Sequence, residues 1–198
     1  RPSACLRFMR SHGKIATGFC GANKTPRDNE GAFVAQPAER WVVHKFGGSS
    51  LADADCFRRV AAIVEGLGEP RIALVLSACQ GVTDQLFQLV TLAERNEDAA
   101  LTAALDRLRL RHERIATELL AADACQAFLA TLRADLADLQ RLLQAVALVR
   151  SAGRDLQDRV AGFGELWSSR LFADFLSGRG GRDPVRWLDA RKIIVVEW

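Results

Sequence analysis

The pattern of apolar and polar residues changes at residue 41 and from there predicts alternating strands and helices. The run WVVHKF, 41–46, is rich in β-forming residues and ends at the polar turn GGSS. Apolar residues then recur at helical spacing from Phe57 to Leu67. The next apolar run, RIALVLSA at 71–78, is typical of a strand covered on both faces.

The order of these elements predicts an α/β fold. The second apolar run is followed by the turn QGVTD and by another helical pattern from Leu86 to Ala93. A strand, a glycine turn and a helix, repeated twice, favour a parallel sheet with right-handed crossovers. We therefore expect a parallel sheet flanked by helices.

Residues 98–150 predict a helical hairpin inserted after this repeat, because they contain neither glycine nor proline. Apolar residues step by three or four along both halves: Leu101, Leu105, Leu108 and Ile115, then Leu132, Leu136, Leu139, Leu143 and Val146. Such a leucine stripe packs into the protein's own core or forms a dimer interface. A further helix is expected after residue 155, followed by short strands at 185–190 and 192–196.

Residues 1–40 form no periodic pattern and predict a disordered extension. They begin with Arg, which suggests a mis-set start codon, and their Arg-rich composition leaves an organelle transit peptide as an alternative. Seven basic and three acidic residues give this segment a net charge of +4. Because the whole chain carries +3, residues 41–198 carry −1 and show no electrostatic footprint for nucleic acid.

Composition narrows the class of protein further. No apolar run approaches the roughly 18 residues that span a bilayer, so no membrane segment is expected. The five cysteines are odd in number, scattered and without CxxC spacing, and the chain has three histidines. A disulfide framework or a metal site is therefore not expected, and a reducing cytoplasm is the predicted location.

The turn after the first predicted strand has the composition of a phosphate-handling loop. Gly47 and Gly48 allow the backbone to approach a phosphate, and the following helix would present its N-terminus to the negative charge. Lys45, at the strand's end, would supply a positive charge. The sequence is neither a P-loop nor GxGxxG, so an ordinary strand-to-helix connection remains an alternative.

The turn after the second strand, SACQGVTD, repeats this composition. Ser77 and Thr83 supply hydroxyls and Gly81 frees the backbone. In open α/β sheets, ligands lie beyond the carboxyl ends of the strands, where both turns fall. Cys79 has no sequence neighbour that would lower its pKa, and we interpret it as structural.

Two later segments contain glycines beside charged residues. GFGELWSSR, 162–170, contains Glu165 in a helical pattern, and an isolated glutamate of this kind is usually solvated. GRGG, 178–181, joins a helix to a predicted strand, so we interpret it as a flexible turn at the opposite end of the sheet.

Taken in order, the segments KFGGSS, LVLSACQGVTD, GELWSSRLF and WLDARK resemble the amino-acid kinase family, and within it the aspartate kinases. The resemblance covers roughly residues 41–198, and the fuller forms of the motifs look most like the bifunctional aspartate kinase/homoserine dehydrogenases. It implies ATP-dependent phosphorylation of the L-aspartate side-chain carboxylate, the first step toward lysine, threonine and methionine.

The resemblance also implies roles for single residues. Lys45 would neutralise the transferring phosphoryl group, with Gly47, Gly48 and, more weakly, Ser49 along the phosphate path. Among the residues at the amino-acid end, Thr83 and Glu165 would hold L-aspartate, Glu165 through its ammonium group, and Ser77 would shape the loop. Asp189 and Arg191 match a family motif and would have a supporting role.

Magnesium would enter with ATP, held largely by phosphate oxygens. The family's nucleotide-binding half should follow residue 198, so we expect the substrate-side part of a truncated kinase domain, inactive alone, and a homo-oligomer in the full-length protein. Two other functions stay open: another amino-acid kinase, or a non-catalytic module that associates through the leucine-striped hairpin.

Overall fold

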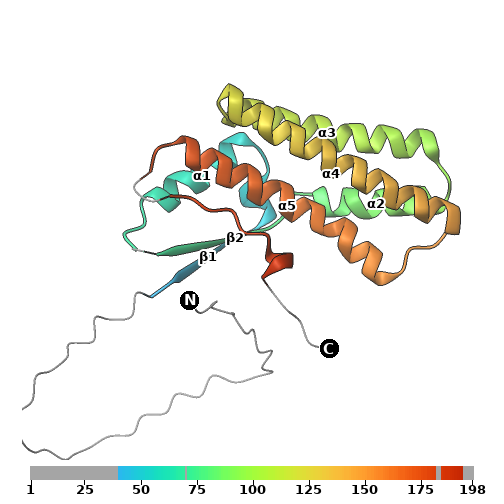
Figure 1. The fold of residues 1–198 in the computed structure, drawn as a ribbon, viewed down its shortest axis with the longest axis horizontal. Helices are drawn as coiled ribbons and strands as arrows, with labels where there is room; N and C mark the ends of the chain where they lie inside the picture. Colours follow the sequence, from blue (N-terminus) through green and yellow to red (C-terminus); the bar gives the residue numbers. More distant parts are fainter. Residues whose placement is uncertain (1–39, 70, 182–183, 194–198) are drawn as a thin grey trace, which may run out of the picture. The chain divides into compact units, whose positions relative to one another are not determined.

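The computed structural model describes residues 40–69, 71–181 and 184–193. Trp41–Trp187 form one compact unit, and residues 188–193 belong to a second unit, described here by itself. The first unit contains, in order, β1 (Val42–Phe46), η1 (Gly48–Leu51), α1 (Ala54–Glu65), β2 (Ile72–Leu76), α2 (Val82–Glu94), α3 (Asp98–Leu119), α4 (Ala122–Val149) and α5 (Arg154–Gly178) (Figure 1). The predicted helical hairpin corresponds to α3 and α4.

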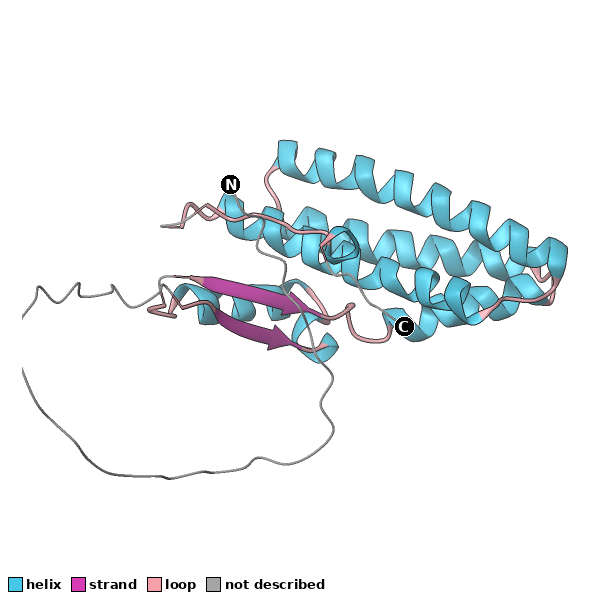
Figure 2. Ribbon diagram, turned by 60° about the horizontal axis from the view of Figure 1, so that its bottom comes forward, coloured by secondary structure: helices cyan, strands magenta, loops and turns pink. Residues whose placement is uncertain are grey.

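The two strands pair in parallel, with a register that runs from Val42 opposite Ile72 to Phe46 opposite Leu76. Figure 2 shows both arrowheads at the same end of the sheet. The predicted α/β class, with a parallel sheet flanked by helices, is confirmed. One detail differs: Val43 and Val75 are 61% and 48% exposed, so the described elements cover β2 on one face. The described helices pack on the other face, where Phe46, Leu74 and Leu76 join the core.

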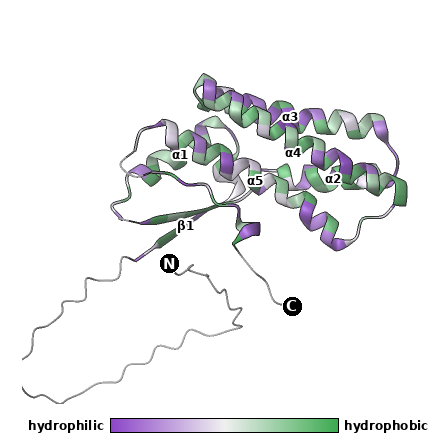
Figure 3. Ribbon diagram, in the orientation of Figure 1, coloured by the Kyte–Doolittle hydropathy of each residue, from purple (hydrophilic) through white to green (hydrophobic). Residues whose placement is uncertain are grey.

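The leucine stripe of the hairpin lies inside the protein's own core. Leu132, Leu139, Leu143 and Val146 are at most 1% exposed. Hydrophobic and hydrophilic residues alternate in bands along α3 and α4 (Figure 3), as expected for amphipathic helices. Core packing, rather than a dimer interface, therefore accounts for this stripe.

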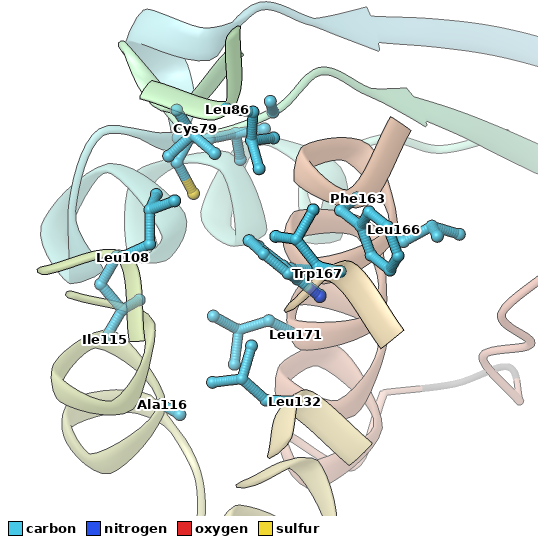
Figure 4. Packing of buried hydrophobic residues seen from close by; sticks show 14 of the residues in the cluster. Cys79, Leu86, Leu108, Ile115, Ala116, Leu132, Phe163, Leu166, Trp167 and Leu171 are labelled. Atoms are coloured by element: carbon cyan, nitrogen blue, oxygen red, sulfur yellow. The ribbon is translucent and has the colours of Figure 1, made fainter. Parts of the chain in front are cut away.

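The centre of the core lies where α5 meets the hairpin. In Figure 4, side chains from α5 point toward those of α3 and α4: Trp167, Leu171, Leu108, Ile115 and Leu132. His112 of α3 is fully buried among them and meets the Trp167 ring edge-on, with the ring centres 5.0 Å apart. Its Nδ1 lies 2.8 Å from the Leu108 carbonyl oxygen, so the neutral ring donates a hydrogen bond there.

We expect the protein to lose stability in mild acid because of His112. Burial lowers the pKa of His112 to about 4, and the nearby Arg111 acts in the same direction. The unfolded chain binds this proton below a pKa of about 6.5, so the free energy of unfolding falls as the pH drops from there toward about 4. Urea unfolding at about pH 7 and about pH 5 measures the loss. The His112→Leu variant should lose less stability over the same interval, and an equal loss would contradict this assignment.

The predicted strand at 185–190 is wrong. Residues 184–189 have no regular secondary structure, and η2, a short 3-10 helix, follows at Ala190–Lys192. A strand needs a paired neighbour, and the described sheet consists of β1 and β2. The Asp189 side chain accepts a hydrogen bond from the Arg191 backbone N–H and so begins the helical turn instead. Of the predicted strand at 192–196, Lys192 lies in η2 and Ile193 follows it, while 194–196 lie outside the described residues, as do residues 1–39.

Candidate functional site

The loop after β1 is open on one side and tightly packed on the other. Lys45, near the end of β1, and Ser49, in η1, are exposed, and a Cβ added at Gly47 would meet no atom within 4 Å. A Cβ on Gly48, in contrast, would lie 2.9 Å from the Ala78 carbonyl oxygen, closer than such atoms can approach. Gly48 is therefore required by the close approach of the β2 loop, while Gly47 faces open space.

The N-terminus of α1, which we expected to face a phosphate, is capped by a side chain of the protein itself. Gly47 is the N-cap of a 3-10 turn, η1, which begins at Gly48 and precedes α1, and Asp53 is the N-cap of α1. The Asp53 carboxylate accepts a hydrogen bond from the Cys56 backbone N–H at 2.8 Å, and this bond lowers the pKa of Asp53. Because a carboxylate caps α1, that prediction is corrected. The backbone N–H groups available for an anion are those of η1, whose first residues have no partners within the turn.

The loop after β2 is held by backbone hydrogen bonds on both sides. The Ser77 N–H donates to the Phe46 carbonyl at 3.1 Å, and the Val82 N–H donates to the Cys79 carbonyl at 2.9 Å. Gly81 has a φ of 75°, the left-handed region required at this position of a type II turn. Thr83 follows, half-buried, in the first turn of α2.

Cys79 is confirmed as a structural residue. Its side chain is 1% exposed, and burial raises the pKa of its thiol to about 11. A thiol in this state stays protonated near neutral pH and is a poor nucleophile.

The segment of α5 that contains Glu165 packs directly on the β2 loop. A Cβ on Gly164 would lie 2.6 Å from the Ala78 Cβ and 3.2 Å from Val82. Glu165 is the next residue and is exposed. One turn further along, the buried Ser168 donates its Oγ hydrogen bond to the Ser77 carbonyl at 2.8 Å. We name residues 45–53, 77–83 and 164–168 the loop corner.

The fold thus brings together the backbones of the three predicted segments, but it does not join their predicted side chains. Among the residues that the structure describes, no hydrogen bond or ion pair connects Lys45, Thr83 and Glu165. The roles of these three side chains, and those of Gly47, Gly48, Ser49 and Ser77, therefore remain predictions. Ser168 and Ala78 were not singled out from the sequence, although both lie inside the quoted segments, because only the fold reveals that Ser168 bonds to Ser77 and that Ala78 packs against Gly48 and Gly164.

We expect the Ser168→Ala variant to lower the free energy of unfolding by about 1–2 kcal/mol. The reason is that the half-buried Ser77 carbonyl loses the hydroxyl that the buried Ser168 donates to it. Urea unfolding measures this change. The matched control is Ser177→Ala, which removes a hydroxyl from the exposed end of the same helix, where it bonds to the Ala173 carbonyl. Equal effects in the two variants would contradict the importance of the Ser168 contact.

A network of polar side chains fixes the rest of α5. Asp135 of α4 accepts hydrogen bonds from the Trp167 indole at 3.2 Å and from Arg170 at 3.0 Å. The Arg170 guanidinium in turn lies 4.5 Å from the centre of the Trp187 ring, and the Trp187 indole donates to Ser169. The network holds the Glu165 segment of α5 rigidly against α4.

Asp189 and Arg191, in the second unit, form a local pair. The Arg191 guanidinium donates to both Asp189 carboxylate oxygens, at 2.9 and 2.7 Å. This pairing lowers the pKa of Asp189. The pair stabilises η2, in agreement with the supporting role expected for it.

The GRGG segment, 178–181, lies at the end of α5, with Gly180 at a φ of 67°. Its Arg179 forms a bidentate ion pair with Glu65, the last residue of α1. Because α1 begins beside the loop corner, its last residue lies at the other end of the sheet. The expected location of GRGG, at the opposite end of the sheet from the glycine loops, agrees with this contact, but the strand that the segment was expected to lead into is absent from the described residues.

The described residues contain neither a membrane-spanning helix nor a cluster of metal ligands. No helix in this part of the chain is long and apolar enough to cross a membrane. The described ranges also contain no group of three or more His, Cys, Asp or Glu residues that could hold a metal ion.

Comparison with known proteins gives a consistent result. Residues 40–192 match the model of the amino acid kinase family. The chain is 35% identical over 158 residues to bifunctional aspartokinase/homoserine dehydrogenase 1, chloroplastic, of Arabidopsis thaliana, a match that covers 80% of this chain and 17% of that protein. It is also 35% identical over 153 residues to lysine-sensitive aspartokinase 3 of Escherichia coli, covering 77% of this chain and 32% of the relative.

A solved structure agrees with these relatives. The crystal structure of E. coli aspartokinase III in complex with aspartate and ADP superimposes with a TM-score of 0.64 at 32% identity, covering 77% of this chain and 32% of that one. The chain therefore spans between 17% and 32% of the length of these proteins.

Proposed function

The chain belongs to the amino acid kinase family, and from this premise we propose that it is the amino-acid-substrate part of an aspartokinase, which transfers the γ-phosphoryl group of ATP to the side-chain carboxylate of L-aspartate. The observation that carries the proposal is the loop corner. Gly48 and Gly164 both approach Ala78 more closely than any side chain would allow, which unites three segments that are separate in the sequence.

Lys45 is assigned to the transferring phosphoryl group. It lies at the carboxyl end of a strand, next to a loop whose Gly47 faces open space, so a phosphate can approach the backbone there. The side-chain carboxylate of aspartate is already a nucleophile and needs no strong base. Its oxygen forms a bond to the γ-phosphorus, the bond between that phosphorus and ADP breaks, and Lys45 neutralises the charge.

Thr83 and Glu165 are assigned to L-aspartate. Thr83 is half-buried in the first turn of α2, and Glu165 is exposed on the part of α5 that Gly164 anchors to the same loop. A carboxylate held at this position suits the ammonium group of an amino acid, and a hydroxyl suits a carboxylate. Ser77 contributes through its backbone, which bonds to β1 and to Ser168.

ATP would contact the residues of this site directly, whereas magnesium would be held mainly by the nucleotide. ATP supplies the phosphoryl group, and Lys45 with the η1 backbone would meet its phosphates. The described residues offer no cluster of metal ligands, so magnesium held mainly by phosphate oxygens is the form consistent with this chain.

Aspartate is favoured over other amino-acid substrates by the relatives. The compared proteins are named as aspartokinases, and the solved structure of one of them contains aspartate and ADP. The non-catalytic module has no comparable support, because the leucine stripe that it would use is buried in the core.

The test joins this chain to the partner half that a kinase needs. Residues 41–193 replace the matched 32% of lysine-sensitive aspartokinase 3 of E. coli. The chimera is assayed for ATP-dependent formation of aspartyl hydroxamate, in which hydroxylamine traps the acyl phosphate. We expect product with L-aspartate and little with L-glutamate. A folded chimera that prefers glutamate, or that forms no hydroxamate, would overturn the proposal.

We also propose a cellular compartment and an oligomeric state for the full-length protein. The described cysteines Cys56, Cys79 and Cys125 are unpaired and buried, which supports a reducing compartment such as the cytoplasm. Because plant relatives are named as chloroplastic, a reducing organelle is the competing location. A homo-oligomer is proposed for the full-length protein.

A further inference from the structure

The loop that carries the glycines is held at its far end by a side chain from the helical hairpin. Arg111 of α3 is half-buried, and its Nη2 donates a hydrogen bond to the Ala52 carbonyl at 3.0 Å. Ala52 is the residue between η1 and the N-cap of α1. The carbonyl of a residue at the end of a helical turn accepts no hydrogen bond from within that turn. The Arg111 guanidinium donates the hydrogen bond that this carbonyl would otherwise lack.

A second hydrogen bond joins α1 to α3, and in this one the donor side chain belongs to α1. Arg58 of α1 donates to the Glu118 carbonyl near the end of α3, at 2.8 Å. Residues 111 and 118 are separated by two helical turns, about 10 Å along the axis. Two arginine-to-carbonyl bonds therefore fasten the start of α1 to the hairpin at separate points.

Arg111 also lies close to the other loop of the corner. Its charge opposes the effect of burial on the pKa of Cys79, which belongs to the loop after β2. One side chain of the hairpin thus bonds to the loop after β1 and acts electrostatically on a residue of the loop after β2.

The glycine loop needs such an anchor because its own packing is one-sided. Glycine loses more backbone entropy on ordering than any other residue. Gly48 is packed against Ala78, whereas the Cβ side of Gly47 faces open space and the Gly47 carbonyl accepts a hydrogen bond from the Ser50 N–H at 3.0 Å. Leu51, at the end of η1, is fully buried in the core, and the Arg111 bond adds a polar contact from a distant element at the next residue, Ala52.

We propose that Arg111 is a positioning residue for residues 47–53, through which the α3–α4 hairpin holds the glycine loop in place. The effect of Arg111 on catalysis rests on the proposed function, since the loop that Arg111 holds is the one assigned to the phosphoryl group. The hairpin thereby acquires a role beyond packing: it helps to fix the η1 backbone relative to Lys45, which pairing of β1 with β2 holds in place.

The test measures backbone amide exchange in the 198-residue chain without ligands, so its outcome does not depend on the proposed function. In Arg111→Met we expect exchange to rise about tenfold at residues 48–53, including the Ser50 amide that bonds to Gly47, while α2 and α4 stay unchanged. Arg111→Lys, which retains a charged donor, should restore part of the protection. Arg107→Met, one turn earlier on the same helix and exposed, is the matched control.

Unchanged exchange at 48–53, or an equal rise throughout the chain, would overturn the proposal. In the chimera, Arg111→Met should lower kcat and leave the KM for L-aspartate near that of the parent, because the loop faces the phosphoryl group. A loosened loop with unchanged kcat would also overturn it. If the parent chimera does not phosphorylate aspartate, the proposed function fails, whereas the exchange experiment still decides whether Arg111 holds the loop.

Discussion

Replacing Lys45 by alanine in the chimera is expected to lower kcat for aspartate phosphorylation by about 100- to 1,000-fold. Charge develops on the transferring phosphoryl group, and a pre-positioned cation stabilises that charge more in the transition state than in the ground state. The KM for L-aspartate should change little, because the proposed site assigns the amino acid to Thr83 and Glu165 and not to Lys45. Hydroxamate formation at saturating ATP and aspartate gives kcat directly.

Two controls make this experiment specific. Lys45→Arg keeps the positive charge but changes its geometry, so it should retain more activity than Lys45→Ala. Arg107→Met removes an exposed positive charge from α3 and should leave kcat unchanged. Near-normal turnover in Lys45→Ala would exclude the role assigned to this residue.

The Gly164→Ala substitution is expected to lower the free energy of unfolding by about 2–3 kcal/mol. The new Cβ would lie 2.6 Å from the Ala78 Cβ, and both atoms belong to backbone-fixed positions that cannot rotate away. The β2 loop and α5 must separate to accept it. Urea unfolding of the 198-residue chain measures the loss.

A double-mutant cycle shows whether this contact is the cause. Ala78→Gly alone removes a buried methyl group and should cost about 1 kcal/mol. Combined with Gly164→Ala, it removes the atom that causes the clash, so the double variant should be more stable than the sum of the two single effects predicts. Strict additivity would contradict the contact. Gly162→Ala, on the same helix with no atom within 4 Å of the added Cβ, is the matched control.

Local patterns predicted most of the architecture. Helical periodicity identified α1 to α5, and the apolar runs identified β1 and β2, because each of these elements buries a regular stripe or run. The prediction of a strand at 185–190 was wrong, and the sequence of that segment alone could not have shown why. A strand depends on a partner, and VRWLDA has none in the described sheet.

The candidate site was predicted as a set of residue types but not as a geometry. Composition around Lys45 and Gly81 pointed to two loops and the resemblance added the segment of Glu165, and the fold joins the three through Ala78 and Ser168. Contacts between residues about 90 positions apart leave no periodic signal in one sequence. The same limit hid the anchoring of Ala52 by Arg111, whose residues are 59 positions apart, whereas the Asp53 cap of α1 is a local contact over three residues.

The central claim is that the loop corner binds L-aspartate, and nuclear magnetic resonance of this chain tests it most directly. L-Aspartate is titrated into the isotopically labelled 198-residue protein, and the backbone amide shifts are mapped, with D-aspartate as the control. The account predicts shifts at Thr83, at Glu165 and along residues 77–83, and weaker ones with D-aspartate. Shifts confined to the α3–α4 hairpin, or none in the loop corner, would contradict it.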